Sequence, residues 1–200
     1  SVSPYGQMHE GVMSTQLGMK GFPSLAETIQ IQRDLSILAY TGGKLHIPTV
    51  STQESVQLIR AAKNQGLDVT CSVDLNHLIF CDDDLAGFDT NFKLLPPLRA
   101  ASDRAALLEG VKDGTIDHLV SNHQPVNFDH KYCEFGLAQP GALGLQTAVL
   151  LSLELFDLDV VSRAWSTGIR EAFGLQVAHI EEGRLAELSL IALNRPSVFK

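Results

Sequence analysis

Two short segments of this 200-residue chain, 74–77 and 122–123, hold side chains that could bind a metal or transfer a proton. Asp74, His77 and His123 supply the carboxylate and imidazole groups that zinc prefers and that act as general acids and bases. Asn122 cannot do the same, because an amide takes up no proton near neutral pH and is a weaker metal ligand than a carboxylate. By residue type alone, Asp74, His77 and His123 are therefore candidate metal ligands or proton carriers, and Asn122 is not.

Two other groups of potential ligands have simpler structural explanations. The acidic run from Asp82 to Asp84 is expected to be a solvated turn or the acidic first turn of a helix. A calcium loop would spread its ligands over about a dozen residues and close with a glutamate, which this segment does not do. The cysteines, Cys71, Cys81 and Cys133, form no CxxC pair and are expected to be reduced thiols.

Composition limits the classes of partner. The formal net charge of −8 argues against nucleic acid or an anionic membrane surface, since both favour clustered Lys and Arg. No stretch approaches the roughly 20 apolar residues of a membrane helix, and no basic start followed by an apolar run marks a signal peptide. With 44% hydrophobic residues, the chain can build one sizeable core. We therefore expect a cytoplasmic protein.

Apolar periodicity predicts alternating helices and strands. The predicted helices cover residues 24–40, 51–66, 102–109, 143–156 and 160–173, and the predicted strands cover 44–50, 68–73 and 116–121, with one or two weak strands within 183–193. This order is typical of parallel βα units, whose functional residues lie in the loops after the strands. Thr49, Asn76 and Asn122 each follow a predicted strand. His46 is expected to point to the opposite face from Thr49, packed or partly exposed.

Two predicted helices begin with a capping-box pattern, Ser24 with Glu27 and Ser51 with Glu54. In this motif the serine hydroxyl accepts a hydrogen bond from the backbone three residues on, and the glutamate reaches back to the serine backbone. We therefore expect both serines to cap their helices.

Several blocks resemble the dihydroorotase family of metal-dependent amidohydrolases, which open or close the ring of dihydroorotate. The blocks are LHIPTVSTQES (45–55), VDLNHL (73–78), FDTNFKLLPPLR (88–99) and DRAALLEGVKDGTIDHLVSN (103–122). Their order and spacing match the family over about residues 8–180. The resemblance implies that residues 1–175 are the C-terminal part, about strands 6–8 with their helices, of a TIM-type (β/α)8 barrel, and that 176–200 return to a small β domain. It further implies a fragment of a polypeptide about twice as long, with other metal ligands upstream.

Four positions that are functional in the family differ here. Thr49 stands for a zinc-binding histidine, and Asn122 for the aspartate that binds metal and shuttles the proton. Leu95 replaces an asparagine that contacts substrate, and Val126 replaces a substrate-binding histidine. The resemblance therefore implies no catalytic, metal or substrate ligand at these positions. Framework positions of the family are kept: Ser51, Thr52, Asp89, Thr90, Asn91, Pro96, Pro97, Leu98, Arg99 and Gly144.

Three functions compete. The favoured prediction is a catalytically inactive dihydroorotase-like protein of pyrimidine biosynthesis, without a cofactor, which forms homo-oligomers and supports the catalytic chain of aspartate carbamoyltransferase. The alternative is an active dihydroorotase or related cyclic-amide hydrolase with a non-standard metal site that draws on Asp74, His77 and His123. The third is a binding or regulatory module that reuses the scaffold. Metal content and dihydroorotase turnover of the full-length protein would discriminate between them.

Overall fold

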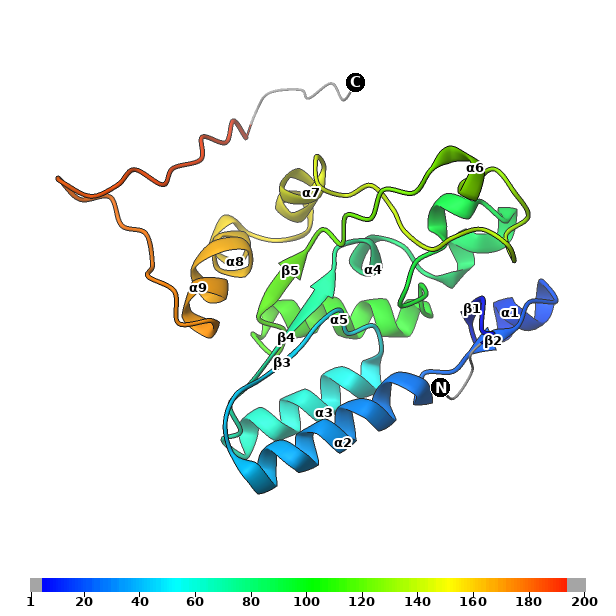
Figure 1. Ribbon diagram of the computed structural model, residues 1–200, viewed down its shortest axis with the longest axis horizontal. Coiled ribbons are helices and arrows are strands. Elements are labelled where there is room, and N and C mark those ends of the chain that lie inside the picture. Colours follow the sequence, from blue (N-terminus) through cyan, green and yellow to red (C-terminus); the bar gives the residue numbers. More distant parts are fainter. Residues whose placement is uncertain (1–4, 194–200) are drawn as a thin grey trace.

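The computed structural model describes residues 5–193, which are built around a parallel sheet of three strands. The strands are β3 (Leu45–Ile47), β4 (Val69–Asp74) and β5 (His118–Val120), with β4 in the middle. Helix α3 (Gln53–Asn64) connects β3 to β4, and α4 (Asn76–Ile79) and α5 (Ala101–Lys112) lie between β4 and β5. Figure 1 shows this alternation, which confirms the predicted parallel βα order.

Helices cover one face of the sheet. Helix α2 (Leu25–Thr41) packs against α3, and α3 packs against α5, below the strands in Figure 1. The core includes Ile59 of α3, Leu107 of α5 and the β4 side chains Cys71 and Val73, all at most 1% exposed. Because successive strand residues point to opposite faces, the alternate β4 residues point away from these helices.

The second face of the sheet is polar. Thr70, Ser72 and Asp74 alternate with the apolar residues of β4, and His46 and His118 lie beside them on the neighbouring strands. His46 Nδ1 is 2.9 Å from Thr70 Oγ1, and the two histidine rings are 5.6 Å apart between centroids. His46 is half-buried, which confirms the expected packed or partly exposed position.

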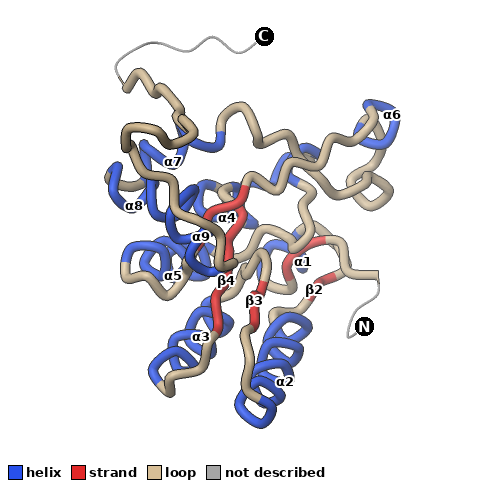
Figure 2. Tube along the Cα trace, turned by 60° about the vertical axis from the view of Figure 1, so that its left-hand side comes forward, coloured by secondary structure: helices blue, strands red, loops and turns tan. Residues whose placement is uncertain are grey.

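Short elements surround this framework. Near the start, β1 (Met8–His9) pairs in parallel with β2 (Gly21–Phe22), and α1 (Val12–Gln16) lies between them in the chain. Two 3-10 turns, η1 (Asp82–Gly87) and η2 (Thr90–Phe92), follow α4. After β5 come α6 (Phe128–Lys131), α7 (Ala148–Leu155), α8 (Leu158–Ser162), a π-helical turn η3 (Arg163–Thr167) and α9 (Gly168–Ala172). Figure 2 shows α7, α8 and α9 on the side of the sheet away from α1 and the β1–β2 pair.

Both capping predictions are wrong in detail. Ser24 makes no side-chain cap; Glu27 instead accepts a hydrogen bond from the backbone nitrogen of Ser51 at 2.9 Å. The α3 cap is Thr52, whose Oγ1 accepts from the backbone nitrogen of Ser55 at 3.1 Å. A carboxylate forms stronger hydrogen bonds with donors that are shielded from water than with donors at the surface. Glu27 therefore turns inward, toward Ser51.

Two predictions for the C-terminal third also need correction. Helix α7 begins at Ala148 and not at residue 143, because the backbone nitrogens of Gly144 and Leu145 donate to His123. Residues 174–193 contain no strand, so the strands predicted within 183–193 are wrong. A weak alternation needs a partner strand to become a sheet, and the described residues provide none there. The division into 1–175 and 176–200 stays a prediction, and residues 194–200 lie outside the described part.

The fold class is confirmed at the level of a partial α/β region with a parallel sheet. Among residues 5–193, no helix is long and apolar enough to cross a membrane.

Candidate functional site

The loops after the three parallel strands meet at one edge of the sheet, where Asp74 ends β4. Thr49 and Asn122 each lie two residues past the end of their strand. Both have left-handed backbones, with φ of 50° at Thr49 and 41° at Asn122. Asparagine tolerates this conformation, whereas for a β-branched residue such as threonine it is strained, at a cost of about 1–3 kcal/mol. Strain of this kind concentrates at functional sites, so this edge is the candidate site.

The Asp74 carboxylate is the centre of this edge. It is 1% exposed and accepts three hydrogen bonds, from the backbone nitrogen of Asn76 (2.9 Å), from Asn76 Nδ2 (3.0 Å) and from Asn122 Nδ2 (3.0 Å). An ionised carboxylate can only accept hydrogen bonds. The donors of both asparagines are therefore turned toward Asp74.

His77 lies directly against Asp74. Its side chain is 1% exposed, and its Nδ1 is 3.6 Å from Asp74 Oδ2. Its Nε2 is 3.1 Å from the carbonyl oxygen of Pro96 and 3.2 Å from that of Pro97. Since carbonyl oxygens accept, Nε2 must carry a hydrogen. The ring is thus held by the loop after β4, and Nδ1 has no hydrogen-bond partner among the described residues.

His123 is not part of this group. It is exposed, and its Nδ1 accepts hydrogen bonds from the backbone nitrogens of Gly144 (3.2 Å) and Leu145 (3.4 Å). Its contacts tie the loop after β5 to the segment before α7. Of the three candidates from the sequence, the structure brings together Asp74 and His77 and leaves His123 apart.

Leu95 and Val126 lie on two loops that contact each other. Leu95 is 57% exposed and immediately precedes Pro96, whose carbonyl meets His77. Val126 is half-buried and lies next to Gly141, where an added Cβ would be 2.8 Å from Val126 Cγ2. The backbone nitrogen of Gly141 donates to Lys93 O at 2.9 Å. The two apolar replacements thus lie on loops joined through Lys93 and Gly141, and their assignment as lost substrate contacts stays a prediction.

A buried ion pair behind the site was missed from the sequence. Arg99 is 3% exposed, and its guanidinium lies 3.7 Å from Glu27, with Nε donating to Ser51 Oγ at 3.0 Å. Glu27 also accepts hydrogen bonds from the hydroxyls of Ser51 and Ser55. Burial lowers the pKa of Arg99, and the charge of Glu27 opposes this. The sequence did offer a signal for this ion pair, since Ser51 and Arg99 are both kept framework positions of the family. A buried arginine requires a carboxylate partner, so a kept arginine indicates such a pair.

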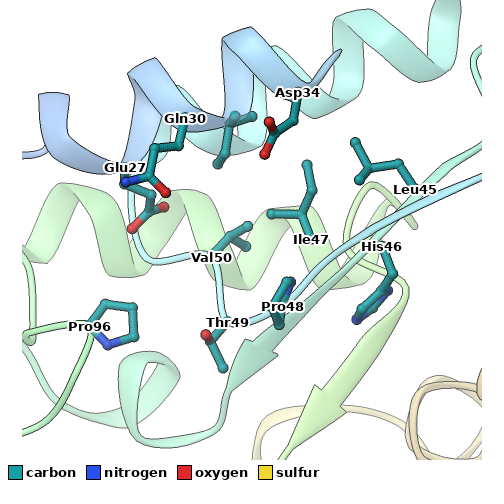
Figure 3. A pocket seen from close by; sticks show the side chains of 11 residues that line it. Glu27, Gln30, Asp34, Leu45, His46, Ile47, Pro48, Thr49, Val50 and Pro96 are labelled. Atoms are coloured by element: carbon teal, nitrogen blue, oxygen red, sulfur yellow. The ribbon is translucent and has the colours of Figure 1, made fainter. Parts of the chain in front are cut away.

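This ion pair supports the loop that carries Thr49. Arg99 Nη1 also donates to the carbonyl oxygen of Phe22 at 2.8 Å, so it joins β2 to the same loop. Beside it lies a pocket of about 250 Å³ between α2 and β3. Figure 3 shows Glu27 and Pro96 toward one end of this pocket and Leu45 and His46 toward the other, with Thr49 between them.

Other kept framework residues also have structural roles. Thr90 Oγ1 donates to Lys131 O at 2.7 Å, and Asp89 accepts from the backbone nitrogen of Asn91 at 2.9 Å. An added Cβ at Gly144 would lie 2.5 Å from Ser121 O, closer than any side chain permits. These positions are explained by packing and capping.

The described residues do not by themselves fit a zinc centre. Zinc is bound by thiolate, imidazole and carboxylate groups, whereas Thr49 and Asn122 offer neutral oxygen atoms. Asp74 already accepts three hydrogen bonds, and His77 contributes one unpartnered nitrogen. We therefore derive no catalytic step through a metal from these residues.

Within residues 5–193, one group of three potential ligands has metal-like spacing, formed by Cys81, Asp82 and Asp83. It lies at the start of η1, where Asp84 accepts a hydrogen bond from the backbone nitrogen of Cys81 at 2.8 Å. Burial raises the pKa of the Cys81 thiol, which opposes formation of a thiolate ligand. Asp82, Asp83 and Asp84 form the first turn of η1, which confirms the expected acidic first turn of a helix.

Comparison with curated proteins gives relatives that are named dihydroorotase. No family model matches the chain. Dihydroorotase from Bacillus subtilis is 40% identical over 202 residues, which cover 96% of this chain and 46% of that protein. The chain therefore spans about half the length of the curated relatives it matches.

Solved structures agree on the fold. L-Hydantoinase (dihydropyrimidinase) from Arthrobacter aurescens has a TM-score of 0.67 and 28% identity, over 72% of this chain and 34% of that chain. Dihydroorotase in complex with 5-fluoroorotic acid from Saccharomyces cerevisiae has a TM-score of 0.67 over 76% of this chain and 44% of that chain. Its identity is 16%, so it supports the fold alone.

These comparisons correct two predictions. The favoured prediction of an inactive carbamoyltransferase subunit is wrong, because the relatives that match almost the whole chain are named dihydroorotase and nothing indicates inactivity or that association. The expectation of no cofactor is also wrong, because the resemblance to these relatives implies a zinc-dependent family. The homo-oligomer and the carbamoyltransferase partner stay predictions. Over the segment that it shares with these relatives, the chain is similar to the dihydroorotase family of the amidohydrolase superfamily.

Proposed function

We propose that the chain is part of an active dihydroorotase, or of a related cyclic-amide hydrolase, with a non-standard metal site. The observation that carries this proposal is the position of the Asp74 carboxylate. The family pattern has a threonine where this chain has Asp74 and an aspartate where it has Asn122. Asp74 Oδ2 lies 3.0 Å from Asn122 Nδ2, so the sheet edge keeps a carboxylate, moved from the loop after β5 to the end of β4.

The burial of Asp74 supports a role in the site. A negative charge that is 1% exposed interacts with its neighbours at low effective dielectric, where its effect on a bound ring is stronger than in water. Asp74 belongs to the same sheet edge as Thr49 and Asn122, whose strained backbones mark the loops expected to carry function. We assign Asp74 the role of orienting Asn76 and Asn122, with His77 packed against it.

The finer assignments form part of the same proposal. Strands β3, β4 and β5 would be about the sixth, seventh and eighth strands of a TIM-type barrel, with 176–200 leading to a small β domain. The whole protein would hold its metal mainly through residues outside this chain, since the described ones do not fit zinc. Its setting would be pyrimidine biosynthesis in the cytoplasm, as the resemblance implies.

The proposal is tested by dihydroorotate turnover of the full-length protein, before and after chelation and metal return. We expect turnover that chelation removes and metal restores. Asp74→Asn should reduce the rate about 100-fold, the lower range for loss of a preorganised hydrogen-bonding group in a site. Asp159→Asn, on the exposed first turn of α8, is the matched control and should change the rate less than about twofold. Turnover at background level in the metal-loaded wild type would refute the proposal.

A further inference from the structure

Three aromatic rings meet on the polar face of the sheet and form a ring cluster: His46 of β3, His118 of β5 and Phe173 at the C-terminal end of α9. The ring centroids of the two histidines are 5.6 Å apart, and that of Phe173 is 5.3 Å from His46 and 6.3 Å from His118. We propose that the ring cluster is a pH-sensitive contact, which holds α9 against the sheet when both histidines are neutral and releases it when His118 takes up a proton. This contact involves none of the residues at the Asp74 edge, so it does not depend on the proposed function.

His118 is the member of the ring cluster on which a proton would have the largest effect. It is 2% exposed, and neither Nδ1 nor Nε2 has a hydrogen-bond partner among residues 5–193. A neutral imidazole has one donor and one acceptor, whereas an imidazolium has two donors and a full charge. Burying that charge without an acceptor costs far more than burying the neutral ring. The closed arrangement therefore disfavours the proton, and burial is the main cause that lowers the pKa of His118.

Within residues 5–193, the charged groups around the ring cluster are engaged with other partners. His46 is itself titratable, with Nδ1 2.9 Å from Thr70 Oγ1, and its charge would repel that of His118. Asp117 raises the pKa of both histidines, but its carboxylate is held by Lys63 Nζ at 2.7 and 2.8 Å. The remaining groups on the packed elements are Asp74 with its two asparagines, Lys44 with Asp68, Arg163 with Val111 O, Arg170 with Glu187, and the exposed Glu171.

Helix α9 is weakly held, so a small change in free energy can move it. None of its residues is buried, and Phe173 is 55% exposed. The side-chain hydrogen bonds and ion pairs of the described residues 168–193 join this segment to itself, as Arg170 does with the carbonyl oxygen of Gln176 and with Glu187. Segments with few buried contacts open at low cost. The ring cluster is therefore a main contact between α9 and the sheet.

A cavity beside the ring cluster gives the contact room to open. It has a volume of about 430 Å³ and lies between the starts of β3 and β4 and the end of α9, with His46, Thr70 and Phe173 in its wall. When Phe173 moves away, water can solvate an imidazolium at residue 118. In this open form His118 has its ordinary pKa of about 6.5, and in the closed form the pKa is lower. The closed form is thus favoured above that pH and loses its advantage as the pH falls.

The test is amide hydrogen exchange of the full-length protein at pH 7.5 and pH 5, with rates corrected for the intrinsic pH dependence of exchange. We expect the opening equilibrium of residues 168–175 in the wild type to increase about fivefold at pH 5, as one histidine with a lowered pKa produces over this range. An opening equilibrium that is the same at both pH values would overturn the proposal, whether or not the protein turns over dihydroorotate.

His118→Phe keeps a ring in the cluster but takes up no proton, so its opening should be the same at both pH values. His130→Gln, on the exposed helix α6, is the control and should keep the fivefold increase. A fivefold increase that persists in His118→Phe would assign the effect to another group and overturn the role of His118. If that variant fails to fold, Phe173→Ala replaces it. Residues 168–175 should then be open already at pH 7.5, and an undiminished pH dependence would contradict the proposal.

Discussion

Two carboxylates with little exposure, Glu27 behind the sheet edge (side chain 14% exposed) and Asp74 at it (1%), have different partners. Glu27 lies 3.7 Å from the guanidinium of Arg99, and its other donors are serines. Asp74 receives its hydrogen bonds from the neutral groups of Asn76 and Asn122. The first group is balanced in charge and fixes the loop before α3. The second pairs its carboxylate with two amides and with His77, 3.6 Å away, in place of an arginine or lysine.

The comparison predicts the largest stability loss at Arg99. Arg99→Met removes the cation and leaves Glu27, whose side chain is 14% exposed, without its opposite charge, which should cost about 3 kcal/mol of unfolding free energy. Denaturant unfolding measures this. The control is Arg33→Met, in an ion pair whose arginine side chain is 63% exposed, and it should cost less than about 1 kcal/mol. Equal losses at the two arginines would show that Glu27 does not depend on Arg99.

A smaller loss is expected at Asp74. Asp74→Asn keeps the shape and weakens the charge-assisted hydrogen bonds from Asn76 and Asn122, at a cost of about 1.5–3 kcal/mol. Unfolding of this variant should be compared with that of Asp159→Asn. If Asp74→Asn is as stable as the wild type, the carboxylate is not what holds the two amides.

The polar face of the sheet predicts a pH effect through His118, which is 2% exposed. Burial lowers its pKa, Asp117 opposes this, and His46 and Lys63 reinforce it. The folded protein thus resists a proton that the unfolded chain accepts below about pH 6.5, so stability is present above that pH and lost as the pH falls. Between about pH 7.5 and pH 5 the wild type should lose about 1 kcal/mol more than His118→Leu. Parallel unfolding curves for the two proteins over this range would contradict the prediction.

The smallest effect is expected at Thr49. Its φ of 50° is strained for threonine and allowed for glycine. Thr49→Gly should therefore stabilise the protein by up to about 1 kcal/mol. Thr52→Gly, which removes the α3 cap, should act in the opposite direction. Thermal unfolding of both variants tests this, and destabilisation by Thr49→Gly would show that the threonine side chain contributes more than its strain costs.

The architecture could be predicted from the sequence because helices and strands depend largely on local apolar periodicity. The alternation of β3, α3, β4, α5 and β5 follows from apolar periodicity, which reports burial directly. Strand ends then follow, and with them the expectation that Thr49, Asn76 and Asn122 share one edge. The prediction of strands within 183–193 was wrong because a strand needs a partner strand, and local alternation does not reveal whether one is present.

The site was less predictable, because its contacts join residues distant in the chain. Asp74 was a candidate ligand, but its bond to Asn122 crosses 48 positions and has no local signature. Glu27 was predicted to take part in a helix cap, but it forms an ion pair with Arg99, which lies in a distant loop. His123 has the right residue type and follows β5, yet its ring binds the backbone before α7. Residue type indicated the chemistry, and tertiary contacts decided which residues share it.

The central claim is that Asp74, at the end of β4, supplies the carboxylate that the family pattern places at position 122, after β5. It is tested most directly by kcat/KM for dihydroorotate in the metal-loaded, full-length wild type, Asp74→Asn and the exchange variant Asp74→Asn with Asn122→Asp. The account predicts a loss of about 100-fold in Asp74→Asn and recovery to within about tenfold of the wild type in the exchange variant, which again pairs one carboxylate with one amide. Wild-type activity in Asp74→Asn would contradict the account.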